Sequence, residues 1–436
     1  MKVLFIDTDG VCIDMALQAQ WSGHQVKVFI SPMRCDNIGR GLVQRVNDWR
    51  DHMKWADLIV MTAVGKYMKE LDSYFAKGFP IMGTNLDAAQ LEVDRETGCE
   101  TFMRVGMDCL PYRSFHNIDE GIAYVKKTKG TFVSKPLHDN ADKSTTYVSS
   151  GPDDMIYMLS KWKKQGKDYP FFLQEKIDAV GEVGVSGWFG PKGWMDMWEE
   201  DFEHKPLMPG NIGPNTGEMG NICKYVEKSK LAEKFLLPMT DTLHALNFRG
   251  NFAMGLIVPK TGDPYPLECT IRLGWPITFM QTELHREPMV EFFKGLLDGE
   301  TRIRVRQDIA CGLVVGIKPF PYEAYAEPSI CEGHPLLGVD QNNIDSVHLA
   351  QVRAGTALVG DTLRERDVFV TAGCYVACCV GRGPSIDTAR DRAIKTAKGL
   401  RIPNSPMYRN DIGSNLGDVT KVLKRKGYLE EWPNAD

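Results

Sequence analysis

Residues 251–272, NFAMGLIVPKTGDPYPLECTIR, predict a strand, a turn and a second strand. In the second strand Glu268 and Thr270 alternate onto one face, and Arg272 continues that face. These side chains suit a magnesium–phosphate site, because Mg²⁺ takes one or two hard oxygen ligands plus phosphate oxygens and Arg offers a fork of donors to a phosphoryl group. An exposed strand face with an ordinary Glu–Arg pair would give the same pattern.

The next informative stretch upstream is glycine-rich. Residues 208–221, MPGNIGPNTGEMGN, predict a loop between two structured regions. Gly213, Gly217 and Gly220 would let backbone N–H groups converge on an anion, and Asn215 and Thr216 add side-chain donors. The stretch therefore indicates a cradle for a phosphate or an acyl phosphate, with a plain surface turn as the alternative.

Further upstream, residues 171–177 and 182–200 predict antiparallel strands, the latter with a turn at residues 190–193. Glu175 and Lys176 end one strand and Glu182 begins the next, which is an arrangement suited to the base and ribose of a nucleotide; a hairpin with solvated charges is the alternative. Lys135 lies inside an apolar strand and Lys143 in the polar loop after it, so either could neutralise ATP phosphates.

The histidines contribute one weaker candidate. His204 leads into the glycine-rich stretch and is a possible substrate contact. His138, His244 and His285 have no partner at metal or triad spacing, so we assign them no role.

Strands and helices alternate over about residues 1–92, which predicts a parallel sheet with helices on both faces. Residues 93–304 form a middle domain in this interpretation, with a small lid subdomain at about 115–178. Residues 305–436 are strand-rich, and a last helix at 385–400 precedes a polar tail. The expected class is thus α/β, built from several domains.

The composition of the chain limits the kinds of partner that it is expected to bind. The 436 residues carry a formal net charge of -5 with acids and bases mixed, so we expect no direct nucleic-acid binding. The sequence has no apolar run of membrane-spanning length, and its N-terminus starts directly with a strand. Eleven cysteines without paired spacing indicate reduced thiols. These features predict a cytoplasmic protein whose partners are small molecules.

Taken in order, the segments resemble phosphoribosylamine–glycine ligases, a family of the ATP-grasp superfamily in purine biosynthesis. GPNTGEMG is similar to the family's GPNTGGMG, and LECTIR to its Glu-Phe-Asn-x-Arg strand. Further similar segments are GTNLDAAQLE (83–92), VRAGTAL (352–358), VTAGCYVACCVG (370–381) and YRNDIG (408–413). The resemblance implies an ATP-grasp fold, preceded by a Rossmann-like domain and followed by a β-rich domain.

The resemblance also implies roles for individual residues. Glu268 would bind Mg²⁺ (or Mn²⁺), Thr270 stands where the family has its second ligand, Asn, and Arg272 would face the phosphates. The ATP-binding residues it implies are Lys135, Lys143, Glu175, Lys176 and Glu182. The residues it places near the acyl phosphate, together with Arg272, are Asn215, Thr216 and Gly217.

Several segments depart from the family pattern. DTDGVCID (7–14) replaces a glycine-rich turn followed by Arg-Glu-His, and LHDNADKSTTYV (137–148) replaces a lid similar to GLAAGKGV. Cys99, with Arg95 nearby, replaces a lysine, and Gly274-Trp275-Pro276 replaces Gly-Asp-Pro-Glu. Since nucleotide and metal residues are mostly kept while substrate-facing ones change, the pattern suggests a relative with altered substrates.

The resulting hypothesis is an ATP-dependent carboxylate–amine ligase that works through an acyl phosphate, as a monomer or homodimer. Glycine and phosphoribosylamine are the default substrates. The alternatives are an amino acid joined to a different amine, such as a modified nucleotide, or a relative that binds a nucleotide without catalysis.

Overall fold

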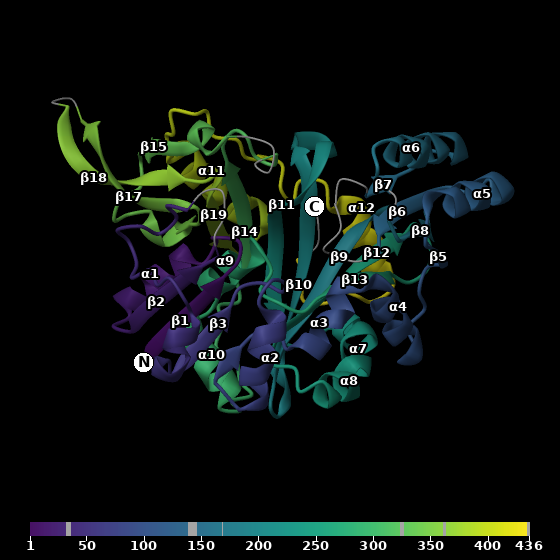
Figure 1. Cartoon of the computed structure of the whole chain (residues 1–436), viewed down its shortest axis with the longest axis horizontal. Helices are drawn as coiled ribbons and strands as arrows, with labels where there is room; N and C mark the ends of the chain where they lie inside the picture. The colour runs from purple at the N-terminus through teal and green to yellow at the C-terminus, as the bar shows by residue number, and fades with distance from the viewer. Residues whose placement is uncertain (32–35, 138–145, 168, 323–326, 361–362, 434–436) are drawn as a thin grey trace.

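The computed structural model describes residues 1–31, 36–137, 146–167, 169–322, 327–360 and 363–433 (Figure 1). The chain begins with a parallel four-stranded sheet in the order β2-β1-β3-β4. Its elements are β1 (Lys2–Asp7), α1 (Ile13–Trp21), β2 (Gln25–Ile30), β3 (Leu58–Met61), α2 (Met68–Ala76) and β4 (Ile81–Met82). The predicted strand–helix alternation and parallel pairing are confirmed.

Asp7 organises the turn after β1. Its carboxylate accepts hydrogen bonds from the backbone N–H groups of Gly10, Val11 and Cys12 at 2.8–3.0 Å and from the Thr62 hydroxyl at 2.9 Å. Asp7 is fully buried, and these donors compensate the loss of water around it. The unusual DTDGVCID segment is therefore a tightly held turn.

Two helices, α3 (Leu86–Val93) and α4 (Arg95–Arg104), lead out of this sheet. Asp94 separates them with an extended backbone, and its carboxylate accepts from the N–H groups of Glu96 and Thr97. Aspartate favours this N-cap position because it satisfies donors that the first helical turn leaves free. Asp94 therefore ends α3 and begins α4.

A second four-stranded sheet, in the order β5-β8-β6-β7, has its own apolar core with two helices. Figure 1 shows this unit projecting from the rest of the molecule. Asn117 caps α5, since its side chain accepts from the N–H of Glu120. The elements are β5 (Tyr112–Phe115), α5 (Ile118–Thr128), β6 (Phe132–Pro136), β7 (Tyr147–Val148), α6 (Pro152–Lys164) and β8 (Phe171–Glu175).

The largest element is an eight-stranded sheet in the order β13-β12-β9-β10-β11-β14-β19-β16. It crosses residue 305, where the sequence suggested a domain boundary, because β11 pairs with β14. The domain limits themselves stay a prediction. The strands are β9 (Ala179–Gly190), β10 (Gly193–Met208), β11 (Ile212–Val226), β12 (Gly250–Pro259), β13 (Tyr265–Thr270), β14 (Ile309–Gly316), β16 (Val347–Leu349) and β19 (Tyr375–Gly383).

Helices cover both faces of this sheet. A Cβ at Gly312 would touch Met280 of α9, whereas a Cβ at Gly381 would meet Ala389 of α11. Gly312 lies opposite Val380, the neighbour of Gly381, so the two helices pack on opposite faces. The remaining helices are α7 (Lys230–Phe235), α8 (Thr240–Ala245), α9 (Ile277–Leu284), α10 (Met289–Leu297), α11 (Ile386–Gly399) and α12 (Gly417–Arg425).

The polar tail predicted after residue 400 contains α12, which packs on β9 and β12. Its buried residues include Val419 and Leu423, and Trp432 beyond it donates a hydrogen bond to Glu200 at 2.8 Å. The prediction of a polar tail was wrong, because these apolar residues bind the end of the chain to the central sheet.

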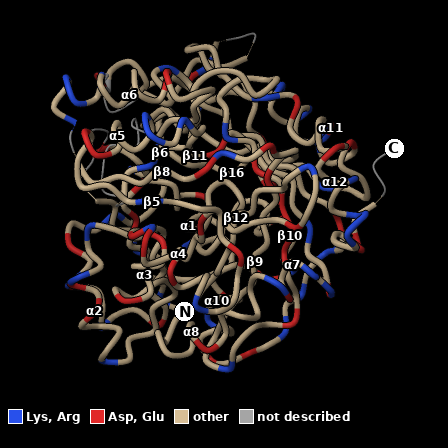
Figure 2. Tube along the Cα trace, turned by 90° about the vertical axis from the view of Figure 1, so that its right-hand side faces the viewer, with Lys and Arg blue, Asp and Glu red and all other residues tan. Residues whose placement is uncertain are grey.

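A three-stranded sheet, in the order β15-β18-β17, completes the fold. It consists of β15 (Glu332–Leu336), β17 (Val352–Val359) and β18 (Arg364–Ala372). Figure 1 shows β17 and β18 extending outward as a ribbon, and Figure 2 shows acidic and basic residues interspersed along the chain. None of the described helices combines the length and apolar character needed to span a membrane.

Candidate active site

Lys205 lies at the centre of a charged cluster on the eight-stranded sheet. Its Nζ is 3.0 Å from Glu203 Oε2, 3.3 Å from Glu182 Oε2 and 3.4 Å from Glu268 Oε1. The three carboxylates come from β10, β9 and β13. Lys205 thereby joins two predicted site residues, Glu182 and Glu268, that lie 86 positions apart in the sequence.

Two glycines lie on the strands next to this cluster. Glu268 lies opposite Gly255 of β12, and Gly255 lies opposite Gly184 of β9. A Cβ at Gly184 would sit 1.9 Å from Oδ1 of Asp201, so glycine is required where that carboxylate packs. The Asp201 carboxylate therefore fills the space over Gly184, while a Cβ at Gly255 would be in ordinary contact with the Glu268 side chain.

The charged side chains of the cluster shift one another's pKa values. The Lys205 ammonium holds the pKa of the Glu268 carboxyl well below its usual range, and Lys135 and Arg95 add to this effect. Burial alone would lower the pKa of Lys205, but Glu203, Glu182 and Glu268 together raise it well above its ordinary value. Glu268 is therefore ionised and Lys205 protonated at neutral pH.

Lys135 and Arg95 approach the same carboxylate from the neighbouring elements. Burial lowers the pKa of Lys135 on β6, and the charge of Glu268 opposes that shift. Arg95, the first residue of α4, donates to the carbonyl oxygen of Pro136 at 2.9 Å. The structure thus places the predicted phosphate-binding Lys135 within electrostatic reach of the predicted metal ligand Glu268.

Arg272 is held in place by a residue that the sequence did not indicate. Its Nε is 3.1 Å from Oε1 of Glu92 at the end of α3, while Oε2 of Glu92 accepts from the N–H of Ile271 at 3.0 Å. Thr270, half-buried, lies two residues from Glu268 on the same strand. Glu268 and Thr270 therefore lie on β13 at the edge of the sheet, whereas Arg272, predicted to continue that strand face, follows two residues after the strand ends.

The predicted glycine-rich loop is mostly strand. Residues 212–226 form β11, and only Pro209–Asn211 make the turn after β10. Gly220 is required for packing, because a Cβ there would lie 2.5 Å from the carbonyl oxygen of Gly312. The loop prediction was wrong because cross-strand pairing with β10 outweighs the preference of glycine for turns.

The same stretch nevertheless contacts the charged cluster. The Thr216 hydroxyl donates to the carbonyl oxygen of Lys205 at 2.8 Å. Asn215, opposite Pro206, and Gly217 are exposed nearby. Since the ammonium of Lys205 contacts Glu268, one residue links the glycine-rich stretch to the metal-binding candidate.

The other predicted site residues are not among those that contact Lys205. Glu175 and Lys176 are exposed at the end of β8, where the Lys176 ammonium donates to the carbonyl oxygen of Ser149 at 2.9 Å. Lys143 lies outside the described residues. His204 is 4% exposed and accepts from the N–H of Gly413 at 3.2 Å, so its predicted substrate contact was wrong.

Glu268 suits a divalent cation. Magnesium in phosphate-binding sites takes one or two protein carboxylates and completes its shell with phosphate oxygens and water. The described residues contain no group of three or more His, Cys, Asp or Glu side chains that could hold a metal by themselves. An ionised Glu268 with the Thr270 hydroxyl beside it therefore fits a metal shared with a nucleotide.

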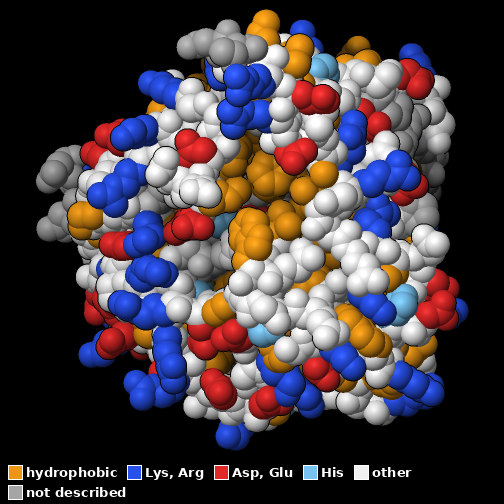
Figure 3. Space-filling view, turned by 90° about the vertical axis from the view of Figure 1, so that its left-hand side faces the viewer, with side chains coloured by type: hydrophobic (Ala, Val, Ile, Leu, Met, Phe, Trp, Pro, Cys, Tyr) orange, Lys and Arg blue, Asp and Glu red, His pale blue; other side chains and the backbone are white. Residues whose placement is uncertain are grey.

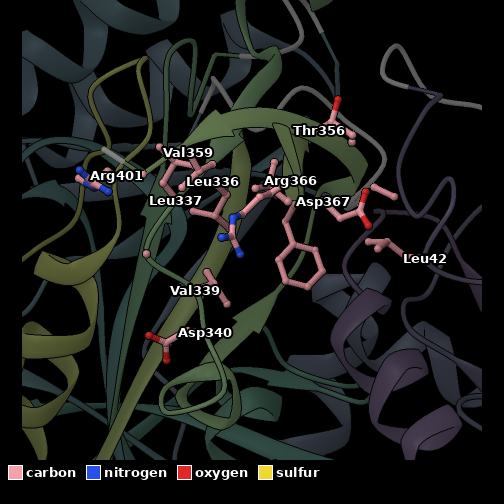
Figure 4. A pocket seen from close by; sticks show the side chains of 16 residues that line it. Leu42, Leu336, Leu337, Val339, Asp340, Thr356, Val359, Arg366, Asp367 and Arg401 are labelled. Atoms are coloured by element: carbon pink, nitrogen blue, oxygen red, sulfur yellow. The ribbon is translucent and has the colours of Figure 1, made fainter. Parts of the chain in front are cut away.

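A separate hollow lies against the three-stranded sheet. It has a volume of about 790 Å³, and Figure 3 shows apolar side chains gathered in it. Leu336, Val339 and Val359 line it together with Arg366 and Arg401 (Figure 4). None of the predicted site residues is among those that line it.

A buried glutamate, Glu199, lies further back on β10, the strand that carries Lys205. Glu199 Oε2 accepts from Ser186 at 3.0 Å and from Gln281 of α9 at 2.6 Å, while Oε1 has no hydrogen-bond partner among the described residues. Burial raises the pKa of Glu199 to about 7. The protonated form is thus favoured in the folded protein at mildly acidic pH.

This shift predicts the pH dependence of stability. A carboxyl whose pKa rises from 4.5 to about 7 on folding stabilises the protein fully below pH 4.5, and the contribution disappears as pH rises to about 7. We expect Glu199→Gln to exceed the wild type in unfolding free energy by about 1–3 kcal/mol at pH 8 and to match it near pH 4.5. Urea unfolding at both pH values measures the difference. Exposed Glu227→Gln is the control, and a difference independent of pH would contradict the assignment.

The central antiparallel sheet, the projecting β5–β8 unit above it and the parallel sheet before it form an ATP-grasp fold. Similar solved structures include phosphoribosylamine–glycine ligase from Thermotoga maritima, with a TM-score of 0.72 and 19% identity over 95% of this chain and 100% of that one. N5-carboxyaminoimidazole synthetase from Staphylococcus aureus in complex with ADP has a TM-score of 0.57 and 11% identity over 91% and 97% of the two chains.

Sequence relatives agree with this likeness. Phosphoribosylamine–glycine ligase from Clostridium acetobutylicum is 23% identical over 95% of this chain and 100% of its own length. The enzyme of the same name from Ralstonia nicotianae is 26% identical over 79% and 80%. No family model matches the sequence. The chain is thus similar to proteins named phosphoribosylamine–glycine ligase, at 23% identity over 95% of its length for the enzyme from Clostridium acetobutylicum.

Proposed function

We propose that this protein is an ATP-dependent ligase that activates a carboxylate as an acyl phosphate and joins it to an amine. Glycine and phosphoribosylamine are the default substrates, as the names of its relatives indicate. The observation that carries the proposal is the cluster of Lys205, Glu268 and Lys135, in which cations surround an ionised carboxylate at one face of the sheet.

The residues of this cluster have distinct tasks. Glu268 and Thr270 would hold Mg²⁺ (or Mn²⁺), which supplies charge neutralisation for the phosphates. Lys135 and Arg272 stabilise negative charge on the transferring phosphoryl group, with Lys143 as a further candidate. The residues that would hold adenine and ribose are Glu175, Lys176 and Glu182. ATP occupies the space between the β5–β8 unit and the central sheet in this proposal.

The chemistry has two steps. An oxygen of the substrate carboxylate attacks the γ-phosphorus of ATP, and ADP leaves. The amine nitrogen then attacks the acyl carbon, inorganic phosphate leaves and the nitrogen loses a proton. Asn215, Thr216 and Gly217 would position the acyl phosphate. Fixing both reactants in line contributes up to about 7–11 kcal/mol toward the second step.

The proposal also includes the division into domains, the cellular compartment and the oligomeric state. Residues 1–92, 93–304 and 305–436 act as three domains, and the β5–β8 unit, at about 115–178, is the lid of the middle one. We also propose a cytoplasmic protein that works as a monomer or homodimer.

Phosphate release from the purified protein tests this function. With ATP, glycine and phosphoribosylamine we expect inorganic phosphate only when all three are present, because each step needs the product of the one before. Omission of each component in turn is the control. Release only with other amines would replace the default substrate pair, and no release with any carboxylate and amine would overturn the ligase.

A further inference from the structure

The two strands of the glycine-rich hairpin, β10 and β11, pair irregularly beside the charged cluster. His204 lies opposite Gly220, but Pro206, two positions later, lies opposite Asn215. The four intervening residues of β11, here called the 216–219 bulge, therefore face a single residue of β10. Extra residues in one strand disrupt the pairing with its neighbour, so the conformation of the bulge depends on other contacts.

A segment near the C-terminus, residues 409–413, contacts β10 on both sides of the lysine at the centre of the charged cluster. Arg409 Nη1 donates to the carbonyl oxygen of Pro206 at 3.0 Å, and the N–H of Gly413 donates to Nε2 of His204 at 3.2 Å. His204 and Pro206 are the two chain neighbours of that lysine. The 409–413 segment thus fixes the backbone from which the central ammonium extends.

Asp411 extends this support to the turn between the two strands. Its carboxylate accepts from Nε of the fully buried Arg409 at 2.8 Å, from Nη2 at 2.7 Å, and from the N–H of Gly210 at 2.8 Å. Although burial opposes the shift, the hydrogen bonds from Arg409 and Gly210 hold the pKa of Asp411 below its ordinary value. A guanidinium that binds a carboxylate through two parallel hydrogen bonds fixes its direction as well as its distance.

Both ends of the 216–219 bulge are tied to these contacts. At one end the Thr216 hydroxyl donates to the carbonyl oxygen of Lys205 at 2.8 Å. At the other end a Cβ at Gly220 would lie 2.8 Å from Cδ1 of the buried Ile412, so the 409–413 segment packs directly over this position. The bulge is therefore held between β10 and the C-terminal segment.

His204 accepts a hydrogen bond in its neutral form. Its Nδ1 lies 3.3 Å from the carbonyl oxygen of Phe202, which can only accept, so Nδ1 carries the proton and Nε2 is free to accept from Gly413. Burial, and then the charge of Arg409, lower the pKa of His204, which favours this neutral form. His204 thus acts on the site through the backbone next to it and not through a substrate.

We propose that Arg409, Asp411 and His204 are positioning residues of the ligase. They hold Lys205 and the 216–219 bulge in the arrangement that shields the acyl phosphate from water. The inference rests on the proposed ligase function, in which the bulge contacts the acyl phosphate. If the bulge moves, water replaces the amine as the nucleophile, and the carboxylate and phosphate are released without amide.

The ratio of phosphate released to amide formed tests this role. With ATP, glycine and phosphoribosylamine we expect one phosphate for each amide in the wild type. Arg409→Met should lower kcat for amide formation about 10- to 100-fold, the range for lost hydrogen bonds to a charged group, and should release phosphate in excess of amide. Arg409→Lys keeps the charge without the planar fork and should lie between the two. A one-to-one ratio in both variants, once folded, would overturn the proposal.

Arg382→Met is the matched control. It removes an arginine that pairs with Glu283 and Asp308, both at 3.1 Å, and these two residues belong neither to the hairpin nor to the charged cluster. We expect it to lower thermal stability while phosphate and amide stay one to one, and excess phosphate in this variant too would contradict a specific role of the 409–413 segment. If Arg409→Met does not fold, Asp411→Asn provides the same test of the ratio.

Hydrogen exchange separates this inference from the ligase proposal, because it needs no turnover. We expect the backbone N–H groups of residues 213–220 to exchange faster in Arg409→Lys and Asp411→Asn than in the wild type, since local opening follows the loss of supporting contacts. Faster exchange in the variants of a protein that shows no turnover supports the positioning role and contradicts the ligase. Coupled turnover with unchanged exchange in both variants supports the ligase and contradicts the positioning role.

Discussion

Replacing Glu268 by glutamine is expected to lower kcat by about 10²–10³-fold, the cost of removing one group that stabilises transition-state charge. The substitution keeps the shape of the side chain but removes the carboxylate that the Lys205, Lys135 and Arg95 charges keep ionised. Steady-state phosphate release at saturating ATP over a series of Mg²⁺ concentrations measures the effect. A higher Mg²⁺ requirement should accompany the loss of kcat.

Asp263→Asn is a matched control for Glu268→Gln. Asp263 lies in the turn before β13 and pairs with Lys234 at 2.8 Å, away from the charged cluster. We expect this variant to retain wild-type kcat and Mg²⁺ dependence. If Glu268→Gln also retained them, Glu268 would not be the metal ligand, and a wild type without turnover would instead indicate a nucleotide-binding protein.

Replacing Lys205 by methionine should lower kcat/KM for ATP by about 10²–10³-fold. Lys205 is the one cation within 4.0 Å of Glu182, Glu203 and Glu268 among the described ion pairs, so its loss leaves three carboxylates facing one another. Their mutual repulsion disfavours the approach of a triphosphate. Kinetics with ATP varied at fixed substrate concentrations measure the change.

Lys205→Arg keeps the positive charge and is the control for Lys205→Met. We expect it to recover part of the lost kcat/KM, because guanidinium can pair with the same carboxylates although its planar fork differs from an ammonium in geometry. Equal losses in the two variants would mean that the length of the side chain matters more than its charge. Wild-type kinetics in Lys205→Met would remove Lys205 from the active site.

Local patterns predicted much of this fold. The alternation of apolar strands with helices indicated the parallel sheet, and the strand–turn–strand around Glu268 was confirmed. Motif order along the chain indicated the ATP-grasp fold, which the solved structures support. These features depend on neighbouring residues, so a single sequence contains enough information to predict them.

The residues at the centre of the site are brought together by the pairing of strands that are distant in the sequence. Lys205 contacts Glu182 and Glu268 only because β10, β9, β12 and β13 pair in one register, which no local pattern specifies. The alternation of Asp201, Glu203 and Lys205 along β10 was the available signal for a charged face. Glu92 gave no comparable signal, since it gains its position from contacts with Ile271 and Arg272, which are distant in the sequence.

Transfer of ¹⁸O from the substrate carboxylate to phosphate tests the central claim most directly. The protein is given ATP, phosphoribosylamine and glycine labelled with ¹⁸O in its carboxyl group, and the released phosphate is analysed by ³¹P NMR. Activation as an acyl phosphate predicts one ¹⁸O atom in each phosphate, because the carboxylate oxygen that attacks the γ-phosphorus leaves with it. Amide product accompanied by unlabelled phosphate would contradict the account.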